Sequence, residues 1–321
     1  MTWRSVVVPR FGAPDVLRVD VGEVPRPGPG ELRVRVLAAG VAPADVQMRA
    51  GQYPGRIPPP PFVPGWDVAG IVDAVGPDVS GQWTGQAVVA LVLRGGHTSH
   101  VCMPSGSVVP LPEGTDVPTA ACLPLNYLTA HELVHQVARV RRGERVLVDG
   151  APGGVGTALL DVAGRAGART VGAASGDDRA IVTGYGADFV DRTDVAAFDA
   201  GFDPVGAGRH AAALRKGGRL VTCGFLGVLR DPHPRRSAAR QLAQLRLRSL
   251  RPDGRRAVFY RLGVAARCDP ARLHRTLTTL VADLAAGQLR PPPSVRFPLD
   301  EAAEAHRHVT SRTRGKVLLL P

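Results

Sequence analysis

The sequence predicts an α/β protein of two domains, a compact β-barrel-like domain and a domain built on a doubly wound parallel sheet. The chain has 321 residues, and single hydrophobic cores usually stop growing near ~250 residues. Its first third consists of short β-branched runs separated by Pro and Gly clusters, whereas a β-α-β pattern begins at Val146. Two lobes of different architecture are therefore expected.

The order of the expected elements follows the same patterns. Strands of the β-rich part are predicted in "SVVVPRF", "ELRVRVLAAGV", "DVAGIVDAVG" and "QAVVALVL". From about Pro118 the pattern becomes helical, and later "GFDPVG" and "GRLVTCGF" resemble strands of a parallel sheet separated by a helical "GRHAAALRKG". The segment "PARLHRTLTTLVADLAAGQ" predicts a helix that stops at Gly287. Strand, helix and strand are expected after it, the last in "GKVLLL".

The composition excludes several classes of protein. The chain is 44% apolar and 21% charged, and no stretch approaches the ~20 apolar residues of a membrane span. The opening "MTWRSVVVPRFG" lacks the apolar core of a signal peptide, so a cytoplasmic protein is expected. Paired spacing is absent from the cysteines, which argues against a disulfide framework or a zinc ribbon. These are Cys102, Cys122, Cys223 and Cys268.

The net charge of +12 is carried mainly by Arg and is densest between Leu229 and Arg256. No aromatic residue interrupts that stretch, although a platform for single-stranded nucleic acid would need stacking rings there. We therefore expect a solvated or phosphate-facing surface, and nucleic acid is not an expected partner.

A glycine cluster in "VLVDGAPGGVGTALLDVAGRAG" lies where a strand must turn into a helix. Glycines allow close approach of the backbone to a pyrophosphate, and the helix N-terminus offers free N–H groups. The pattern departs from G-x-G-x-x-G through Ala151, and Pro152 removes one N–H near the phosphates. The alternative is a plain tight turn. We predict cofactor contacts at Gly150, Gly153, Gly154, Val155 and Gly156.

The end of the following strand indicates which nicotinamide cofactor binds. An acidic residue about 20 positions beyond the turn is typical of NAD binding, but the strand ends here in "AASGDDR". Ser175 could donate to a 2′-phosphate and Arg179 could pair with its charge, so NADPH is predicted. The alternative assigns the acidic role to Asp177 or Asp178.

Several motifs in order resemble the zinc-free medium-chain dehydrogenase/reductase superfamily, in particular its quinone oxidoreductase-like branch and members similar to the vesicle amine transport protein. They are "RAGQYPGRIPPPPFVPGWDVAGIVDAVG", "LPLNYLTAHELV", "VLVDGAPGGVG", "FDPVG", "GGRLVTCGF", "RAVFY" and "GKVLLL". The resemblance implies a GroES-like catalytic domain over residues 1–121 and 288–321, and a Rossmann domain over 122–287. It also implies a homodimer and cofactor contacts at Asn126, Thr129, Gly224 and Lys316.

The resemblance also bears on the chemistry. Zinc-dependent members place a Cys and a Gly-His-Glu where this chain has "VAPADVQ" and "PGWDVAG". Neither stretch contains Cys or His, so no metal is assigned. Hydride transfer to a small molecule, a quinone or a carbon–carbon double bond conjugated to a carbonyl, is the expected reaction. Tyr53 in "RAGQYPG" matches a Tyr proposed to assist protonation in similar enoyl reductases, although a packing role is equally open.

Two further departures from the family keep other functions open. Ala42 replaces the usual Asn of "VNP", and the chain is about a dozen residues shorter between "DFVDRTD" and "GFDPVG", which predicts a reduced helix in the Rossmann layer. One alternative is a biosynthetic enzyme that uses the same cleft for a cyclisation or another non-redox step. A second alternative is a non-enzymatic RNA- or nucleotide-binding protein, motivated by the positive charge.

Overall fold

The computed structural model describes residues 2–53, 55–206, 210–224, 234–249, 252–311 and 314–321. Contacts divide the chain into two compact units, Met1–Leu128 with Ala266–Pro321, and Thr129–Ala265. These divisions differ from the predicted boundaries at 121/122 and 287/288. The helix α8 (Pro270–Ala285) contacts elements of the first unit, β7 and the π-helical turn η4, which groups it with that unit.

The first unit is built on a seven-stranded sheet of order β14-β15-β3-β4-β5-β7, in which β6 also pairs with β3. A separate two-stranded sheet joins β1 and β2. The strands are β1 (Thr2–Val7), β2 (Arg18–Glu23), β3 (Glu31–Val41), β4 (Asp67–Val75), β5 (Ala87–Leu91), β6 (His100–Pro104), β7 (Val108–Pro110), β14 (Ser294–Pro298) and β15 (Lys316–Leu320). The helical elements are η1 (Pro14–Val16), α1 (Pro43–Arg49), η2 (Gly81–Trp83), η3 (Ser105–Ser107), α2 (Val117–Ala120), η4 (Leu123–Tyr127), α8, η9 (Leu299–Glu301) and α9 (Ala302–Ser311).

Strand β3 organises this sheet because it pairs with β4, β6 and β15. Its side chains alternate between buried and half-buried over most of its length, as expected for a strand with one face in the core. The last strand of the chain, β15, lies antiparallel to β3, with Val317 opposite Val41. The C-terminal segment therefore belongs to the same sheet as the N-terminal third of the sequence.

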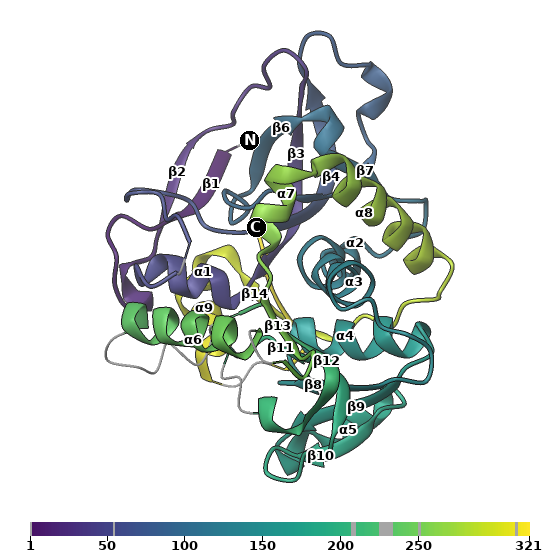
Figure 1. The fold of residues 1–321 in the computed structure, drawn as a ribbon. Coiled ribbons are helices and arrows are strands. Elements are labelled where there is room, and N and C mark those ends of the chain that lie inside the picture. The colour runs from purple at the N-terminus through teal and green to yellow at the C-terminus, as the bar shows by residue number, and fades with distance from the viewer. Residues whose placement is uncertain (1, 54, 207–209, 225–233, 250–251, 312–313) are drawn as a thin grey trace. The chain divides into compact units, whose positions relative to one another are not determined.

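The second unit contains the predicted doubly wound sheet. Its six strands are all parallel and lie in the order β10-β9-β8-β11-β12-β13 (Figure 1), the 3-2-1-4-5-6 order of dinucleotide-binding folds. The strands are β8 (Arg145–Asp149), β9 (Arg169–Ala174), β10 (Asp188–Asp191), β11 (Phe198–Asp203), β12 (Leu214–Thr222) and β13 (Arg256–Phe259). The helical elements are α3 (Leu128–His131), η5 (Glu132–Val137), α4 (Gly154–Arg165), η6 (Gly176–Asp178), α5 (Arg179–Gly184), η7 (Ala211–Ala213), α6 (Pro234–Ser249) and α7 (Leu262–Cys268), which continues into the first unit.

The connections on one side of this sheet are short. Residues 192–197 join β10 to β11 without a helix, which confirms the reduced helix predicted from the sequence. The helix predicted for "GRHAAALRKG" is wrong in its described part, because only η7 is helical and Leu214 already starts β12. Leu214 is 4% exposed and pairs with Phe198. Pairing and burial in the sheet therefore outweigh the local helical preference of the alanines.

No helix in the described part of the chain combines the length and apolar character needed to cross a membrane.

Candidate cofactor and substrate sites

The predicted glycine turn joins the carboxyl end of β8 to the start of α4. Gly150 adopts φ +70°, and a Cβ on Gly156 would lie 2.3 Å from the Gly150 carbonyl oxygen, so both positions require glycine. Helix α4 begins after Gly153 and has no side-chain cap. The N–H groups of Gly154, Val155 and Gly156 are first-turn donors without an intrahelical acceptor. A pyrophosphate fits this arrangement of free donors at a positive helix end.

The predicted phosphate-reading residues lie at the carboxyl end of the next strand, β9. The hydroxyl of Ser175 donates to Asp178 Oδ2 at 2.7 Å, and Asp178 is 3% exposed. Arg179 starts α5 and is exposed, and its guanidinium carbon lies 4.1 Å from the centroid of the Phe189 ring. The stacked guanidinium leaves its N–H groups available to an anion. The two predicted residues are therefore neighbours, but the Ser175 hydroxyl already has an acidic acceptor.

Sequence reasoning missed an acidic residue at the same edge of the sheet. Asp149 is the last residue of β8 and is 2% exposed. Its carboxylate lies 3.6 Å from Arg192 Nε and 3.4 Å from His210 Nε2. Arg192 follows β10, and His210 precedes η7. These contacts connect the residue before Gly150 to the short connection between β10 and β11 and to the residue before η7, and no local sequence pattern indicates either contact.

Two more predicted cofactor contacts belong to this unit. Thr129 lies on α3 and is 6% exposed. Gly224 follows β12, and a Cβ there would lie 2.1 Å from the carbonyl oxygen of Pro204, which follows β11. Gly224 thus allows the chains leaving two adjacent strands to pack closely. The structure brings the glycine turn, Ser175, Arg179 and Gly224 to the carboxyl edge of one parallel sheet, where ligands bind in such folds.

The predicted catalytic residue, Tyr53, belongs to the first unit. It packs against a buried apolar cluster of Val8, Met48, Phe62 and Trp66. Its ring centroid lies 6.0 Å from that of Trp66, with the rings tilted by 60°. Trp66 is 7% exposed, and its indole Nε1 has no hydrogen-bond partner in the described part of the chain. The geometry is compatible with the packing role of Tyr53 as well as with the chemical one.

Trp66 occupies the place of the histidine in the Gly-His-Glu of zinc-dependent relatives. The preceding residue, Gly65, is held by Asp45, which is fully buried and accepts hydrogen bonds from the N–H groups of Ala42 and Gly65, both at 2.8 Å. Burial raises the pKa of Asp45, and His97 opposes that rise. Among the described residues, no group of three or more His, Cys, Asp or Glu side chains is arranged to hold a metal ion.

Asn126 and Lys316, the other predicted cofactor contacts, are also in the first unit and are both buried. Asn126 is 4% exposed, and its Nδ2 has no partner among the described residues. Lys316 Nζ donates to Asp67 Oδ2 at 2.5 Å. A Cβ on Gly40 would lie 2.3 Å from that Nζ, so glycine is required beside the pair. The ammonium has two further N–H donors, but Lys316 is only 2% exposed.

Two buried histidines lie near this ion pair. The rings of His97 and His306 are both fully buried and meet edge to face with centroids 5.8 Å apart. His97 Nε2 contacts the Gly40 carbonyl at 2.9 Å, whereas neither ring nitrogen of His306 has a hydrogen-bond partner in the described part of the chain. Burial lowers the pKa of His306 well below its usual value. His306 is therefore a neutral core residue.

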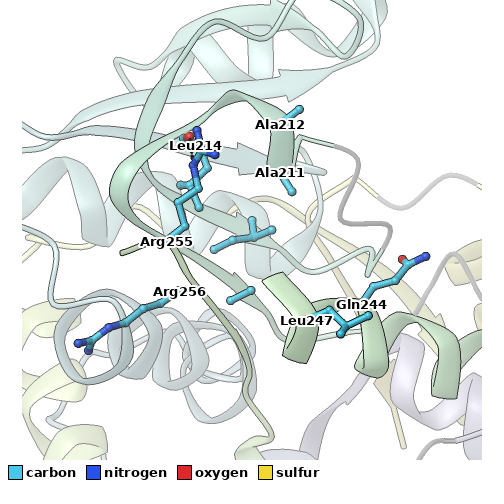
Figure 2. A pocket seen from close by; sticks show the side chains of 9 residues that line it. Ala211, Ala212, Leu214, Gln244, Leu247, Arg255 and Arg256 are labelled. Atoms are coloured by element: carbon cyan, nitrogen blue, oxygen red, sulfur yellow. Dashed lines mark hydrogen bonds between the residues drawn. The ribbon is translucent and has the colours of Figure 1, made fainter. Parts of the chain in front are cut away.

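A separate cavity of about 460 Å³ lies in the second unit and contains none of the predicted site residues. In Figure 2, Gln244 and Leu247 project from α6, and the Arg256 side chain points away from the other labelled residues. The Arg255 guanidinium is already bound to Asp253 and to the Leu214 carbonyl. The lining residues are Ala211, Ala212, Leu214, Leu220, Gln244, Leu247, Arg255, Arg256 and Ala257.

Comparison with known proteins extends over nearly the whole chain. Residues 28–113 match the family model of the alcohol dehydrogenase GroES-like domain, and residues 176–319 match that of the zinc-binding dehydrogenases. These matches and the parallel sheet confirm the predicted GroES-like and Rossmann architecture.

Full-length relatives point the same way. The quinone oxidoreductase of Rattus norvegicus is 30% identical over 99% of this chain and 97% of the relative. The synaptic vesicle membrane protein VAT-1 homolog of the same species is 31% identical over 99% of this chain and 84% of the relative. The solved structure of a quinone oxidoreductase from Pseudomonas syringae pv. Tomato DC3000 superposes with a TM-score of 0.83 at 26% identity, covering 99% of this chain and all of that one (100%).

Proposed function

We propose that this chain, which belongs to the medium-chain dehydrogenase/reductase superfamily, is an NADPH-dependent reductase that transfers hydride to a quinone or an α,β-unsaturated carbonyl compound without a catalytic zinc ion. The superfamily membership makes the chain an oxidoreductase that uses a nicotinamide cofactor. The observation that carries the proposal is the uncapped start of α4 behind a turn that requires glycine at positions 150 and 156. Three free backbone donors at a positive helix end are what a dinucleotide pyrophosphate requires.

The choice of NADPH rests on Arg179. Its exposed guanidinium stacks on Phe189, which fixes the side chain close to the end of β9 while its N–H groups remain free for a phosphate. The hydrogen bond from Ser175 to Asp178 favours the alternative cofactor, because a ribose 2′-hydroxyl could donate to the same carboxylate. NADH is therefore the second candidate, and the two cofactors depend on different residues of one short segment.

The proposed chemistry needs few groups from the protein. The bound nicotinamide supplies the hydride. Addition at the β-carbon of a conjugated carbonyl leaves an enolate, which takes a proton at the α-carbon, and a quinone gains hydride and proton to become a hydroquinone. Tyr53 can donate a hydrogen bond to the carbonyl oxygen or the proton to carbon. The apolar cluster around it, with Phe62 and Trp66, provides a surface for a flat, conjugated acceptor.

The proposed independence from zinc rests on the residues at the metal position. Trp66 stands where a histidine ligand would be, and an indole nitrogen carries its hydrogen and offers no lone pair to a metal. Asp67, in place of the glutamate of that motif, is bound to Lys316. The absence of thiolate or imidazole ligands removes the usual means of polarising an alcohol.

The proposal is tested by following NADPH oxidation with a benzoquinone and with a conjugated enone, before and after dialysis against a strong chelator. We expect turnover with at least one acceptor and no loss after dialysis. Activity that disappears with the chelator and returns with Zn²⁺ would contradict zinc independence. Fluorescence titrations that detect binding of neither NADPH nor NADH would overturn the reductase itself.

A further inference from the structure

The contact between Arg192 and Asp149 crosses one strand of the parallel sheet. Strand β9 lies between β10 and β8, with Asp191 opposite Ala174 and Asp149 opposite Ala173. Arg192 follows β10 directly, so its backbone is about 10 Å from the end of β8, which is two strand spacings. Its Nε nevertheless lies 3.6 Å from Asp149 Oδ1. The Arg192 side chain therefore extends across the carboxyl end of β9.

The end of β9 is the place where a dinucleotide-binding fold distinguishes its cofactors. The residue that contacts the 2′ position of the adenosine ribose follows this second strand of the fold. In this chain Ser175 follows β9, and the register brings it beside Arg192 as both leave adjacent strands. Arg179 starts α5 a few residues later. Two arginines from different elements therefore lie near the 2′ position.

The Arg192 guanidinium has donors available for a ligand. Its side chain is 40% exposed, whereas the Asp149 side chain is 2% exposed. Nε faces Asp149, and the terminal nitrogens Nη1 and Nη2 form no hydrogen bond or ion pair within the described part of the chain. A guanidinium carries five N–H donors in a planar fork that matches the oxygens of a phosphate. Arg192 can thus contact Asp149 through one edge and a phosphate through another.

Asp149 lies where the order of the parallel strands reverses direction. It ends β8, and His210 Nε2, from the segment after β11, lies 3.4 Å from its Oδ2. Strands β8 and β11 are neighbours from which the sheet order runs in opposite directions. Ligands of such sheets bind outside the carboxyl ends of the strands at this switch point. A carboxylate fixed there directs Arg192 from the end of β10 toward the cofactor.

We propose that Arg192 is a second residue that contacts the 2′-phosphate of NADPH, and that Asp149 positions its guanidinium for this contact. The proposal rests on the proposed use of NADPH and extends it to a residue of a different strand. A phosphate monoester carries close to two negative charges at neutral pH. The Ser175 hydroxyl nearby already donates to the Asp178 carboxylate. A second guanidinium offsets the repulsion between that carboxylate and the phosphate.

Nucleotides without nicotinamide test the contact separately from hydride transfer. Adenosine 2′,5′-bisphosphate carries the 2′-phosphate of NADPH, and 5′-AMP lacks it. By isothermal titration calorimetry we expect the parent protein to prefer the bisphosphate by at least about thirtyfold, as two charge-assisted contacts should provide. Arg192→Gln should weaken the bisphosphate by about tenfold and change 5′-AMP by less than about twofold.

The matched control is Arg215→Gln. Arg215 is 50% exposed and pairs with Asp199, but this pair lies at the amino end of the same sheet. The control removes the same charge and an equivalent ion pair, and it should change neither affinity by more than about twofold at moderate salt. Circular dichroism and the melting temperature show that each variant folds.

The possible outcomes separate this proposal from the proposed function. A parent protein that binds both nucleotides equally does not read the 2′-phosphate, which overturns the proposal together with the choice of NADPH. A preference that survives Arg192→Gln overturns the Arg192 contact and leaves NADPH use intact. An equal loss of both nucleotides in Arg192→Gln, or the same selective loss in Arg215→Gln, also overturns the contact.

A double-mutant cycle tests the positioning role of Asp149. Asp149→Asn keeps the shape of the side chain and removes the charge that holds Arg192. The ratio of the two nucleotide affinities should change by more than about threefold in the parent and by less than about twofold in the Arg192→Gln background. A general structural effect would alter both affinities alike and leave the ratio unchanged. An equal change of the ratio in both backgrounds, or no change in the parent, contradicts the positioning role.

Discussion

Reversal of the charge at Arg179 should separate the two nicotinamide cofactors. Arg179 is exposed at the start of α5 and forms no ion pair within the described part of the chain. Its side chain stacks on Phe189, with 4.1 Å from guanidinium carbon to ring centroid. The charge is therefore free to pair with a 2′-phosphate, which NADPH carries and NADH lacks.

The size of the effect follows from the contact that is lost. A hydrogen bond between charged partners contributes about 2 kcal/mol, and Arg179→Glu also adds repulsion. This corresponds to about thirtyfold weaker binding of NADPH. The lost stacking on Phe189, about 0.5–1 kcal/mol at an exposed site, weakens the folded protein and not one cofactor in particular. Binding of NADH should change by less than about threefold, within the range of general electrostatic effects at moderate salt.

The assay is a pair of fluorescence titrations, with NADPH and with NADH, on the parent protein and on the variant. The matched control is Arg169→Glu, because Arg169 is also exposed but lies at the opposite, amino end of β9. The control changes the net charge by the same amount and should leave both affinities nearly unchanged. Equal weakening of NADPH and NADH by Arg179→Glu would show that Arg179 does not read the phosphate.

Three further outcomes are expected. Tyr53→Phe should lower kcat for a conjugated enone about 100-fold in steady-state assays and leave NADPH affinity unaltered, whereas an unchanged enone rate would assign Tyr53 to packing. A homodimer should appear in light scattering, because β13 is the terminal strand of its sheet and Val258 on it is 42% exposed; a monomer at micromolar concentration contradicts this. Burial lowers the pKa of His306. Below about pH 6.5, therefore, this histidine binds a proton in the unfolded chain but not in the folded chain. The free energy of unfolding should fall as the pH drops from 7 to 5. His306→Phe should flatten this slope in urea unfolding, and an identical slope would refute the assignment; the raised pKa of Asp45 acts in the opposite sense but is common to both proteins.

Elements with strong local signals could be predicted from the sequence. Helix α8 follows the apolar spacing of its segment, and Gly287 just beyond it adopts φ +67°, as a C-terminal glycine should. The glycine turn was equally visible, because its requirement is local: a strand end, close backbone approach and a helix start within a few residues. Such local signals predict the folded structure correctly because contacts with distant residues do not compete with them.

Features that depend on distant partners could not be predicted. The ion pair of Lys316 with Asp67 joins residues 249 positions apart, so no local sequence pattern indicates it. The acceptor of the Ser175 hydroxyl depends on the geometry of the turn that brings Asp178 beneath it. Sequence reasoning assigned Ser175 by matching its residue type to a phosphate, and Lys316 through the resemblance to the family. It could not show that each side chain already has a protein partner, and for the single hydroxyl proton of Ser175 the cost of exchanging that partner enters any account of cofactor binding.

The shortened connection between β10 and β11 changes one face of the parallel sheet and preserves the cofactor edge. Successive residues of a strand point to opposite faces. A Cβ on Gly172 would meet Val182 of α5, so its neighbours Val171 and Ala173 face the other side, where they pack with Leu147. Phe198 covers that side and requires glycine at position 201, where a Cβ would lie 2.6 Å from its ring.

Polar contacts also cover this face of the parallel sheet. Asp149 belongs to the face of Leu147 by strand alternation, and there it contacts Arg192 from the shortened connection and His210, which precedes η7. Helices α4 and α5, which contact β8, β9 and β10, are retained. The free N–H groups of the pyrophosphate turn belong to α4, so the loss of a helix between β10 and β11 does not reach them. A chain can therefore lose this part of the layer and still keep the dinucleotide site on which the proposed reductase activity depends.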